Sequence, residues 1–294
     1  MAQRKGIILS GGSGSRLYPI TIVTNKQLVP IYNKPMIYYP LATLMLADIT
    51  ELLIISSPDR IDLFRSLFHY AHQLGISISF AEQAAPRGIA EALIIAEEFL
   101  DGSPSALILG DNFFYGDQLE NILVDSNALT SGASIFAKQV HDPTSYGVVH
   151  LQEDGKPSSI VEKPSQPTSN LAVTGLYFYD ATASERASAL TPSARYELEV
   201  TDLNRLYLQD GLLTVNILPE SHVWYDSGTY EGLLQSSNFV ADTEKKTRKM
   251  IGCIEEIAFR KNWVSQRSSE QLISQLPKGE YRDYLITVQE EIYG

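Results

Sequence analysis

A short apolar stretch, Gly6-Ile7-Ile8-Leu9, runs directly into a glycine-rich segment at residues 11–16 (Gly-Gly-Ser-Gly-Ser-Arg). Glycine backbones turn tightly and let their N–H groups approach a phosphate without obstruction from side chains. A helix that began here would add a favourable dipole, and Arg16 and Lys26 supply positive charge close behind. The sequence therefore predicts a strand that ends in an anion-binding loop. The alternative is a glycine-rich surface turn beside an exposed arginine.

The spacing within this loop excludes two common nucleotide-binding motifs. In a Walker loop, four residues separate the first glycine from a Gly-Lys pair, which Ser or Thr follows. In this chain Arg16 stands five places after Gly11, where the second glycine of that motif would be. A dinucleotide-binding fingerprint needs a third glycine at position 17 and an acidic residue after the next strand. Leu17 occupies the glycine position, and no acidic residue closes the apolar run 52–55. The loop therefore belongs to neither class.

Short apolar runs and helix-like segments alternate through the first half of the chain. The predicted strands cover residues 6–10, 51–57, 76–82 and 104–110, and the predicted helices cover residues 35–47, 60–73, 89–99 and 117–129. Repeated strand–helix units imply a parallel sheet with helices on both faces. Ligands of such sheets bind beyond the carboxyl ends of the strands, where the glycine loop and Gly110-Asp111-Asn112 both lie.

Closely spaced strands follow from about residue 131. They are predicted over residues 133–140, 146–152, 158–162, 172–179, 212–218 and 222–226, with helices over 182–190 and 199–210 and a mostly helical tail from 229. No repeat or flexible linker divides the chain. We therefore predict an α/β fold with a mixed, mostly parallel sheet flanked by helices. Residues 1–228 form the core, and residues 229–294 form a helical C-terminal segment packed on it, in a single continuous domain.

Composition and charge exclude several classes of protein. A net charge of −12 argues against non-specific binding of nucleic acid, which needs a basic surface. No apolar run approaches the roughly 20 residues of a membrane span, and the apolar stretch near the N-terminus is too short for a secretory signal. We therefore expect a cytoplasmic protein without a membrane partner. A single cysteine, Cys253, excludes internal disulfides and a cysteine-built zinc site, and the five histidines show no metalloprotease spacing.

Two carboxylates follow strand-like segments in similar settings. Asp111 comes after the apolar run 107–110, and Asp226 is the last residue of the predicted strand 222–226, just before the helical tail. Each could be a turn or helix-cap residue. Together they favour a magnesium site, because Mg²⁺ takes one or two carboxylates and completes its shell with water and substrate phosphate.

Two further charged pairs leave their roles open. Glu162 and Lys163 would point to opposite faces if their strand continued, so an ion pair between them does not follow from the spacing. Arg195 and Glu197 are two positions apart, so both side chains could lie on one side of an extended segment. Alternatively, they could be charged residues at the start of a helix.

Six segments, in this order and at these spacings, resemble the glucose-1-phosphate thymidylyltransferases, a family of sugar nucleotidyltransferases. They are the loop 11–16 with Lys26 and Pro30, Leu109-Gly110-Asp111-Asn112, Tyr146-Gly147-Val148-Val149, Glu162-Lys163-Pro164, Val173-Thr174-Gly175-Leu176-Tyr177 and Trp224-Tyr225-Asp226-Ser227-Gly228-Thr229. The resemblance runs from about residue 4 to the C-terminal helices. It implies the Rossmann-like nucleotide-diphospho-sugar transferase fold.

The resemblance also implies a reaction and its site. Glucose 1-phosphate and dTTP would give dTDP-glucose, a precursor for dTDP-rhamnose biosynthesis, and pyrophosphate. The implied triphosphate and base site comprises Gly11, Ser13, Gly14, Ser15, Arg16, Lys26, Gln27, Gln83 and Gly88. The implied sugar-phosphate site comprises Asn112, Tyr146, Gly147, Glu162, Lys163, Val173, Arg195 and Glu197. Asp111 and Asp226 would bind Mg²⁺, and Arg16, Lys26, Lys163 and Asp111 would carry catalysis.

Four positions depart from the family pattern, and they leave alternatives open. Ser15 and Ser227 keep the hydroxyl of the usual threonine, whereas Arg87 replaces an aspartate and Tyr196 replaces a glycine. The last two changes leave open UTP or another sugar 1-phosphate as substrate. A non-catalytic protein that binds nucleotide sugars is a third hypothesis. The resemblance further implies a homotetramer with a second, regulatory nucleotide-sugar site, to which Tyr38-Tyr39 or the C-terminal helices could contribute.

Overall fold

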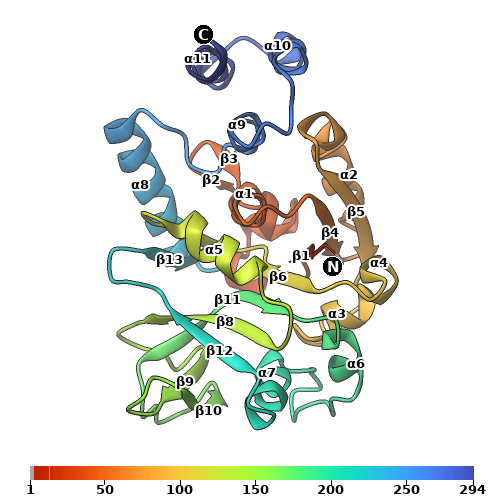
Figure 1. Ribbon diagram of the computed structural model, residues 1–294, viewed down its shortest axis with the longest axis vertical. Helices are drawn as coiled ribbons and strands as arrows, with labels where there is room; N and C mark the ends of the chain where they lie inside the picture. The colour runs from red at the N-terminus through yellow and green to blue at the C-terminus, as the bar shows by residue number, and fades with distance from the viewer. Residues whose placement is uncertain (1–2, 13) are drawn as a thin grey trace.

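A mixed sheet of nine strands organises the computed structural model, which describes residues 3–12 and 14–294. Seven strands follow one another in the order β10-β9-β11-β6-β1-β4-β5, and β8 joins β11 to β12 (Figure 1). Their bounds are β1 Lys5–Leu9, β4 Glu51–Ser56, β5 Ser77–Glu82, β6 Ser105–Leu109, β8 Ala133–Gln139, β9 Gly147–Leu151, β10 Pro157–Glu162, β11 Leu171–Tyr179 and β12 Leu213–Ile217. The predicted strands are confirmed to within one or two residues.

The first half of the chain forms the parallel part of this sheet. β1 lies between β4 and β6, and it pairs in parallel with both. Its central residues Ile7 and Ile8 are fully buried on opposite faces, and each belongs to a different apolar core. Because both faces must be covered, the sheet carries helices on both sides. Those of this half are α1 Tyr38–Leu46, α2 Ile61–Leu67, α3 Glu91–Ile95, α4 Glu97–Leu100 and α5 Leu119–Asn127.

Two predicted helices are interrupted. The segment 60–73 ends as an α-helix at Leu67 and resumes as a short 3₁₀-helix, Ala71–Leu74. The segment 89–99 consists of α3 and α4, which meet at the buried Ala96. The helical periodicity was correct in both cases.

The second half adds strands that pair antiparallel, except β12, which pairs in parallel with β8. β11 pairs antiparallel with β6, β8 and β9, and so joins the parallel part to the later strands. α6 Ala183–Ser188 and α7 Val200–Gln209 cover this part, as predicted. Figure 1 shows β9, β10 and α7 together at one end of the molecule and α9 to α11 at the other.

Two short ribbons contain pairings that were not predicted, although β13 itself matches the strand predicted over 222–226. β2 Pro30–Ile31 pairs with β3 Lys34–Pro35, and β7 Asn112–Tyr115 pairs antiparallel with β13 Val223–Asp226. The chain therefore does not simply turn after β6, because a second strand begins at Asn112. Its partner lies more than 100 positions away, a long-range pairing that local spacing cannot indicate.

The tail is helical, as predicted. It contains α8 Tyr230–Thr247, α9 Ile254–Arg260, α10 Gln266–Gln275 and α11 Glu280–Tyr293, with breaks at Gly252 and around Pro277-Lys278-Gly279. Apolar residues of α9, α10 and α11 share a core with α1. The division of the chain at residue 228 stays a prediction.

A buried carboxyl ties this tail to the core. Glu255 on α9 is 1 % exposed and accepts hydrogen bonds from the hydroxyl groups of Tyr70, at 3.0 Å, and Tyr281. Burial raises the pKa of Glu255, and hydrogen bonds from Tyr281 and Tyr70 offset only part of that effect. No cation of the described residues forms an ion pair with it.

Glu255→Gln should make stability less dependent on pH. Because its folded-state pKa is raised, Glu255 contributes stability at acidic pH that is lost as the pH rises through that pKa. The glutamine cannot ionise. We therefore expect the free energy of unfolding of the variant to rise relative to that of the parent protein by about 1 kcal/mol between pH 4, below the ordinary pKa of a glutamate, and pH 8. Urea unfolding at the two pH values measures this, and a constant difference would contradict it.

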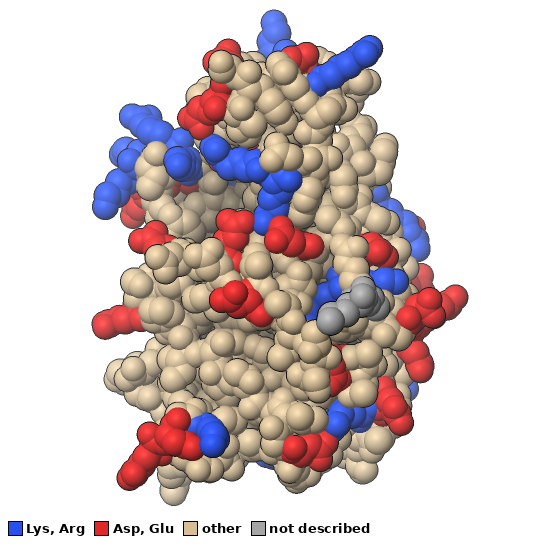
Figure 2. Space-filling view, viewed as in Figure 1, with Lys and Arg blue, Asp and Glu red and all other residues tan. Residues whose placement is uncertain are grey.

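Charge is distributed unevenly over the surface. Figure 2 shows many of the Lys and Arg side chains of this face over its upper, helical part, where some Asp and Glu side chains also lie, and a mixture of both signs over the rest of the face. Within the described chain, no helix has both the length and the apolar character that a membrane span requires.

Candidate active site

The glycine loop follows β1 at the carboxyl edge of the parallel strands. Gly12 and Gly14 have φ values of 94° and 63°, a backbone region that side chains with a Cβ rarely adopt. Ser15 begins only a three-residue 3₁₀-helix, Ser15–Leu17, so the helix dipole expected at this loop is reduced to one turn. Ser13, which we predicted to bind nucleotide, lies outside the described residues.

Gly11 is required by a close approach. A Cβ at this position would lie 2.5 Å from Oε1 of Gln83, which is itself buried. Gln83 follows β5, the neighbour of β4 in the parallel part, and so reaches the same edge of the sheet. Its Nε2 donates to Oε2 of Glu91 at 2.8 Å and to the backbone oxygen of Gly88 at 3.4 Å. Gln83 and Gly88, which we predicted to lie around the base, are therefore neighbours of Gly11, which we predicted to hold the triphosphate.

Lys26 and Gln27 lie on a second 3₁₀-helix, Lys26–Leu28. The side chain of Asn25 caps this helix by accepting from the backbone N–H of Gln27 at 2.8 Å. Gln27 is buried, and its Oε1 has no hydrogen-bond partner among the described residues. Lys26 instead lines a cavity of about 240 Å³ that it shares with Gly12 and Gln83.

The unpredicted ribbon brings the two carboxylates together. Asp226 stands opposite Asn112 in the β7–β13 register, and the backbone N–H of Ser227 donates to the backbone oxygen of Asp111 at 2.8 Å. Two cations reach this acidic pair. Arg16 contacts Asp226 at 3.0 Å and Asp111 at 3.9 Å, and Lys26 forms an ion pair with Asp111. Asp226 is not the cap of α8, because the side chain of Thr229 accepts from the N–H of Gly232.

The two carboxyl groups have opposite pKa shifts. Burial alone would raise the pKa of Asp111, but the ammonium group of Lys26 and a hydrogen bond from it more than offset burial and lower that pKa. Burial and repulsion by Asp111 raise the pKa of Asp226. The site therefore keeps Asp111 ionised and leaves Asp226 as the carboxyl group that gains most from another cation.

The two carboxylates and Arg16 border one small gap. A Cβ on Gly228 would lie 2.5 Å from Oδ2 of Asp111, 2.9 Å from Oδ1 of Asp226 and 2.9 Å from Nη2 of Arg16. Within the described chain, no cluster of three or more His, Cys, Asp or Glu residues could hold a metal ion. Two carboxylates and open positions fit Mg²⁺, which keeps water and substrate oxygens in its shell.

Asn112 holds the two strands of this edge in place. Its Nδ2 donates to Oδ1 of Asp111 at 3.1 Å, and its Oδ1 accepts from the N–H of Gly175 at 3.0 Å and from Nε1 of Trp224 at 2.6 Å. The amide thus links β7 to β11 and β13. The sequence indicated no role for Trp224 beyond its place in a motif.

A larger cavity of about 550 Å³ adjoins the acidic pair. The structure brings nine predicted site residues into its lining: Arg16, Asp111, Asn112, Tyr146, Gly147, Glu162, Lys163, Val173 and Asp226. Thr201, on the first turn of α7, also lines it and donates to Oε2 of Glu162 at 2.5 Å. Thr201 carries no motif signal, since it reaches the cavity only through the packing of α7 on β10.

The charged residues at the rim pair with one another. Lys163 leaves the strand with a φ of 42°, and its ammonium group lies 3.7 Å from Oε1 of Glu162, so the strand does not keep them on opposite faces. Arg195 contacts Glu162 at 3.2 Å, Glu199 at 2.9 Å and Glu197 at 3.6 Å. Arg195 and Glu197 do not themselves line the cavity, and they precede α7 rather than begin it.

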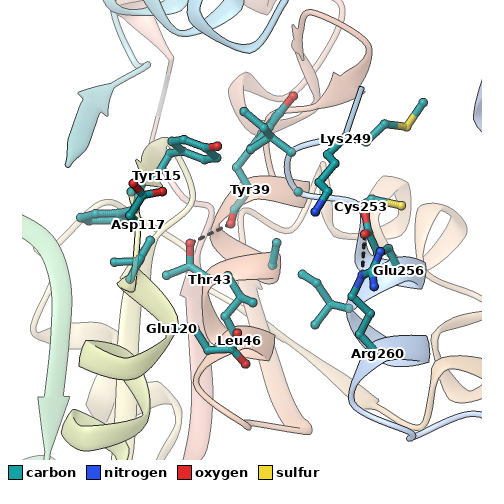
Figure 3. Close-up of a pocket in the computed structure, with 18 of the residues that line it drawn as sticks. Tyr39, Thr43, Leu46, Tyr115, Asp117, Glu120, Lys249, Cys253, Glu256 and Arg260 are labelled. Atoms are coloured by element: carbon teal, nitrogen blue, oxygen red, sulfur yellow. Dashed lines mark hydrogen bonds and ion pairs between the residues drawn. The ribbon is translucent and has the colours of Figure 1, made fainter. Parts of the chain in front are cut away.

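A third cavity, of about 490 Å³, lies away from the glycine loop. Figure 3 shows Tyr39 and Thr43 of α1 on one side of it and Glu256 and Arg260 of α9 on another, with Lys249 pointing into it. Tyr39 and the C-terminal helix α9 belong to the regions, Tyr38-Tyr39 or the C-terminal helices, that we expected could contribute to a second site.

Comparison with known proteins places the chain in a family. Residues 5–243 match the family model described as nucleotidyl transferase. Glucose-1-phosphate thymidylyltransferase of Xanthomonas campestris pv. campestris is 48% identical over 285 residues, covering 97% of each chain. The enzyme of that name from Neisseria meningitidis is 49% identical over 282 residues, covering 96% of this chain and 98% of the relative.

A solved structure agrees with these relatives. The crystal structure of a proposed glucose-1-phosphate thymidylyltransferase from Bacillus anthracis, in complex with sucrose, has a TM-score of 0.74 and 40% identity. The match covers 81% of this chain and 96% of that one. The chain therefore belongs to the nucleotidyl transferase family and groups within it with the glucose-1-phosphate thymidylyltransferases.

Proposed function

We propose that this chain transfers a thymidylyl group from dTTP to glucose 1-phosphate, which yields dTDP-glucose and pyrophosphate. One observation carries the proposal: the ion pair between Lys26 and Asp111 joins the cavity beside the glycine loop to the larger cavity beside Lys163. Two anionic substrates can therefore meet where the positive charges of Arg16 and Lys26 are concentrated. The names of the relatives agree with this reaction.

The triphosphate would occupy the cavity beside the loop. Backbone N–H groups around Gly11, Gly14 and Ser15 and the cations Arg16 and Lys26 would neutralise its oxygens. Gln27, Gln83 and Gly88 would surround the base. The strand ends that carry these groups are the usual ligand edge of an α/β sheet.

The sugar phosphate would occupy the larger cavity. Lys163 and Arg195 supply the positive charge for its phosphate, and polar groups around the sugar would come from Asn112, Tyr146, Gly147, Glu162 and Glu197, with Val173 as an apolar contact. The pairing of Arg195 with three carboxylates holds its guanidinium group at the rim without substrate. That preorganisation favours an in-line approach.

The reaction needs no general base. A phosphate oxygen of glucose 1-phosphate attacks the α-phosphorus of dTTP, the bond from that phosphorus to the bridging oxygen breaks, and its electron pair leaves with pyrophosphate. A phosphate monoester is largely a dianion at neutral pH, because its second pKa is about 6. The protein must instead reduce repulsion between anions and position them. A site without a catalytic histidine, serine or cysteine agrees with this requirement.

Magnesium is the divalent cation that we propose for this site. Asp111 and Asp226 would hold it at the gap beside Gly228, where it would neutralise charge on the triphosphate.

A cytoplasmic location stays a prediction.

Of the four departures from the family pattern, Arg87 and Tyr196 are the two that leave other substrates open, and both lie outside the two cavities. Tyr196 is 85% exposed, and neither Tyr196 nor Arg87 lines the cavity beside the loop or the larger one. Neither side chain would therefore contact a substrate bound in these cavities.

A panel of substrate pairs tests the proposed function. Pyrophosphate release is measured with Mg²⁺ for dTTP, UTP and CTP, each crossed with several sugar 1-phosphates. We expect dTTP with glucose 1-phosphate to give the highest kcat/KM. Preference for another pair would change the substrate assignment, and binding without release from any pair would indicate a non-catalytic protein.

We further propose that the chain forms a homotetramer with a regulatory nucleotide-sugar site at the third cavity. Lys249 and Arg260 provide positive charge there, and Tyr39 and Ile257 provide apolar surface, a combination that suits a nucleotide sugar. Arg260 is held by Glu256 at 2.7 Å and by Glu291 at 2.9 Å, whereas Lys249 forms no ion pair with the described residues.

Lys249→Ala should weaken feedback inhibition. We expect the concentration of dTDP-glucose that halves the rate, at saturating dTTP and glucose 1-phosphate, to rise about tenfold, the effect of losing one charged contact to an anion. The uninhibited rate should stay unchanged. Lys245→Ala on α8 is the control. Equal inhibition of both variants and the parent protein would place the regulatory site elsewhere.

A further inference from the structure

We propose that Glu91 is a positioning residue that orients the side-chain amide of Gln83 so that its carbonyl oxygen faces the nucleotide. Resting on the proposed function, this inference explains how the site would prefer thymine or uracil to cytosine. It goes beyond Gln83 itself, because the residue that sets the orientation of the Gln83 amide, Glu91, would not contact the base.

The hydrogen bonds around Gln83 determine which way its amide points. An amide carries both a donor and an acceptor, and only its surroundings decide between the two orientations. Nε2 of Gln83 lies 2.8 Å from a carboxylate oxygen of Glu91 and 3.4 Å from the backbone oxygen of Gly88. Both neighbours only accept hydrogen bonds. The opposite orientation would place three oxygens together, so the amide group must direct its NH₂ towards Glu91.

The carbonyl oxygen of Gln83 consequently faces the glycine loop. Oε1 is the atom nearest to a Cβ built on Gly11, at 2.5 Å. Among the described residues, no donor forms a hydrogen bond to it. Gln83 and Gly12 line the same cavity as Lys26, so a nucleotide whose phosphates lie at Lys26 and the loop can bring its base within reach.

Glu91 is itself held from two sides. Its other carboxylate oxygen, Oε1, lies 3.4 Å from Nε of Arg87, one turn earlier. The backbone around it is anchored to the segment before α7: the N–H of Ala90 donates to the oxygen of Leu198 at 3.2 Å, and the N–H of Leu198 donates to the oxygen of Arg87 at 2.7 Å. The Glu91 carboxylate, 15% exposed, therefore has little freedom to turn away from Gln83.

An inward carbonyl oxygen distinguishes pyrimidines by hydrogen bonding. Thymine and uracil carry an N–H at ring position 3, which can donate to Oε1 of Gln83. Cytosine carries an unprotonated nitrogen at that position, and two acceptors would face each other. Sites that bind a substrate N–H select strongly, because a mismatched buried polar group is left unpaired.

Exchange of the two charges tests this proposal. Arg87→Glu combined with Glu91→Lys keeps the net charge and still allows an ion pair between positions 87 and 91. The introduced lysine can only donate, so the amide of Gln83 should turn its NH₂ to the base. We expect the ratio of kcat/KM for dTTP to kcat/KM for CTP to fall at least about 30-fold, mainly through KM. Glu91→Gln retains an acceptor, and we expect its ratio to stay within about threefold of the parent value.

Controls distinguish a failure of this proposal from a folding defect and from a failure of the proposed function. Exchange of Asp62 and Arg65, an exposed ion pair on α2, should leave the ratio unchanged. A parent-like ratio in the variant with Arg87→Glu and Glu91→Lys, together with a parent-like melting temperature, would overturn the role of Glu91. Calorimetry of dTTP and CTP binding gives the same comparison without turnover. A parent protein that releases no pyrophosphate with any pair would contradict the proposed function, while the binding ratio would still test Glu91.

Discussion

Asp111→Asn should lower turnover at least about 100-fold, the scale seen when a charged partner of the transition state is lost. Asp111 is buried and forms an ion pair with Lys26, and it also lies within 3.9 Å of Arg16. Asparagine preserves its shape and removes its charge. The variant would lose a ligand for the divalent cation and would no longer hold the ammonium group of Lys26 in place.

Initial rates of pyrophosphate release over a Mg²⁺ titration measure this effect. We expect the rate to stay low at saturating Mg²⁺ and the apparent affinity for Mg²⁺ to fall. Asp62→Asn, which removes an exposed carboxylate on α2, is the control and should behave as the parent protein. A folded Asp111→Asn variant with a near-normal rate would refute the role assigned to this carboxylate.

Lys163→Ala should lower kcat/KM for glucose 1-phosphate at least about 100-fold. Lys163 lines the larger cavity, and its nearest anion, Glu162, lies 3.7 Å away and is also bonded to Arg195 and Thr201. The ammonium group is therefore available to a substrate phosphate, and its removal leaves Glu162 with other partners. The fold should tolerate the change, because Lys163 is 46% exposed.

The two substrates should respond differently to this variant. Binding of dTTP, measured by calorimetry, should change less than twofold, whereas the rate with glucose 1-phosphate falls. Lys156→Ala, at the other end of β10, removes a more exposed ammonium group and is the matched control. Equal losses for dTTP and glucose 1-phosphate would show that Lys163 serves the whole site and not the sugar phosphate.

The parallel part of the fold could be predicted from local patterns. Each strand there is a short apolar run, and each following helix has its own periodicity, so the elements appear in the sequence without knowledge of their partners. The antiparallel strands were likewise predicted from local patterns, as short strand-like runs separated by turn residues. The breaks of the predicted helices after Leu67 and at Ala96 had no signal in the periodicity.

The pairing of β7 with β13 had no local signal. Residues 112–115, which follow Asp111, form a strand only because residues 223–226 pair with them. The structure brings Asp111 and Asp226 to the same place, and their shared role in binding a metal ion stays a prediction. Their contact with one arginine, and the opposite pKa shifts that follow, required the ribbon.

By itself, the chain's sequence established the order of strands and helices, the glycine loop and the residue types that suit an anionic substrate, because these depend on neighbours a few positions apart. Only the folded molecule decided which groups meet. It set Lys26 against Asp111, turned the amide of Gln83 towards Glu91 and left Arg195 at the rim. Such contacts join residues from separate elements, and a hydrogen bond or ion pair depends on distances of a few ångströms that spacing along the chain does not determine.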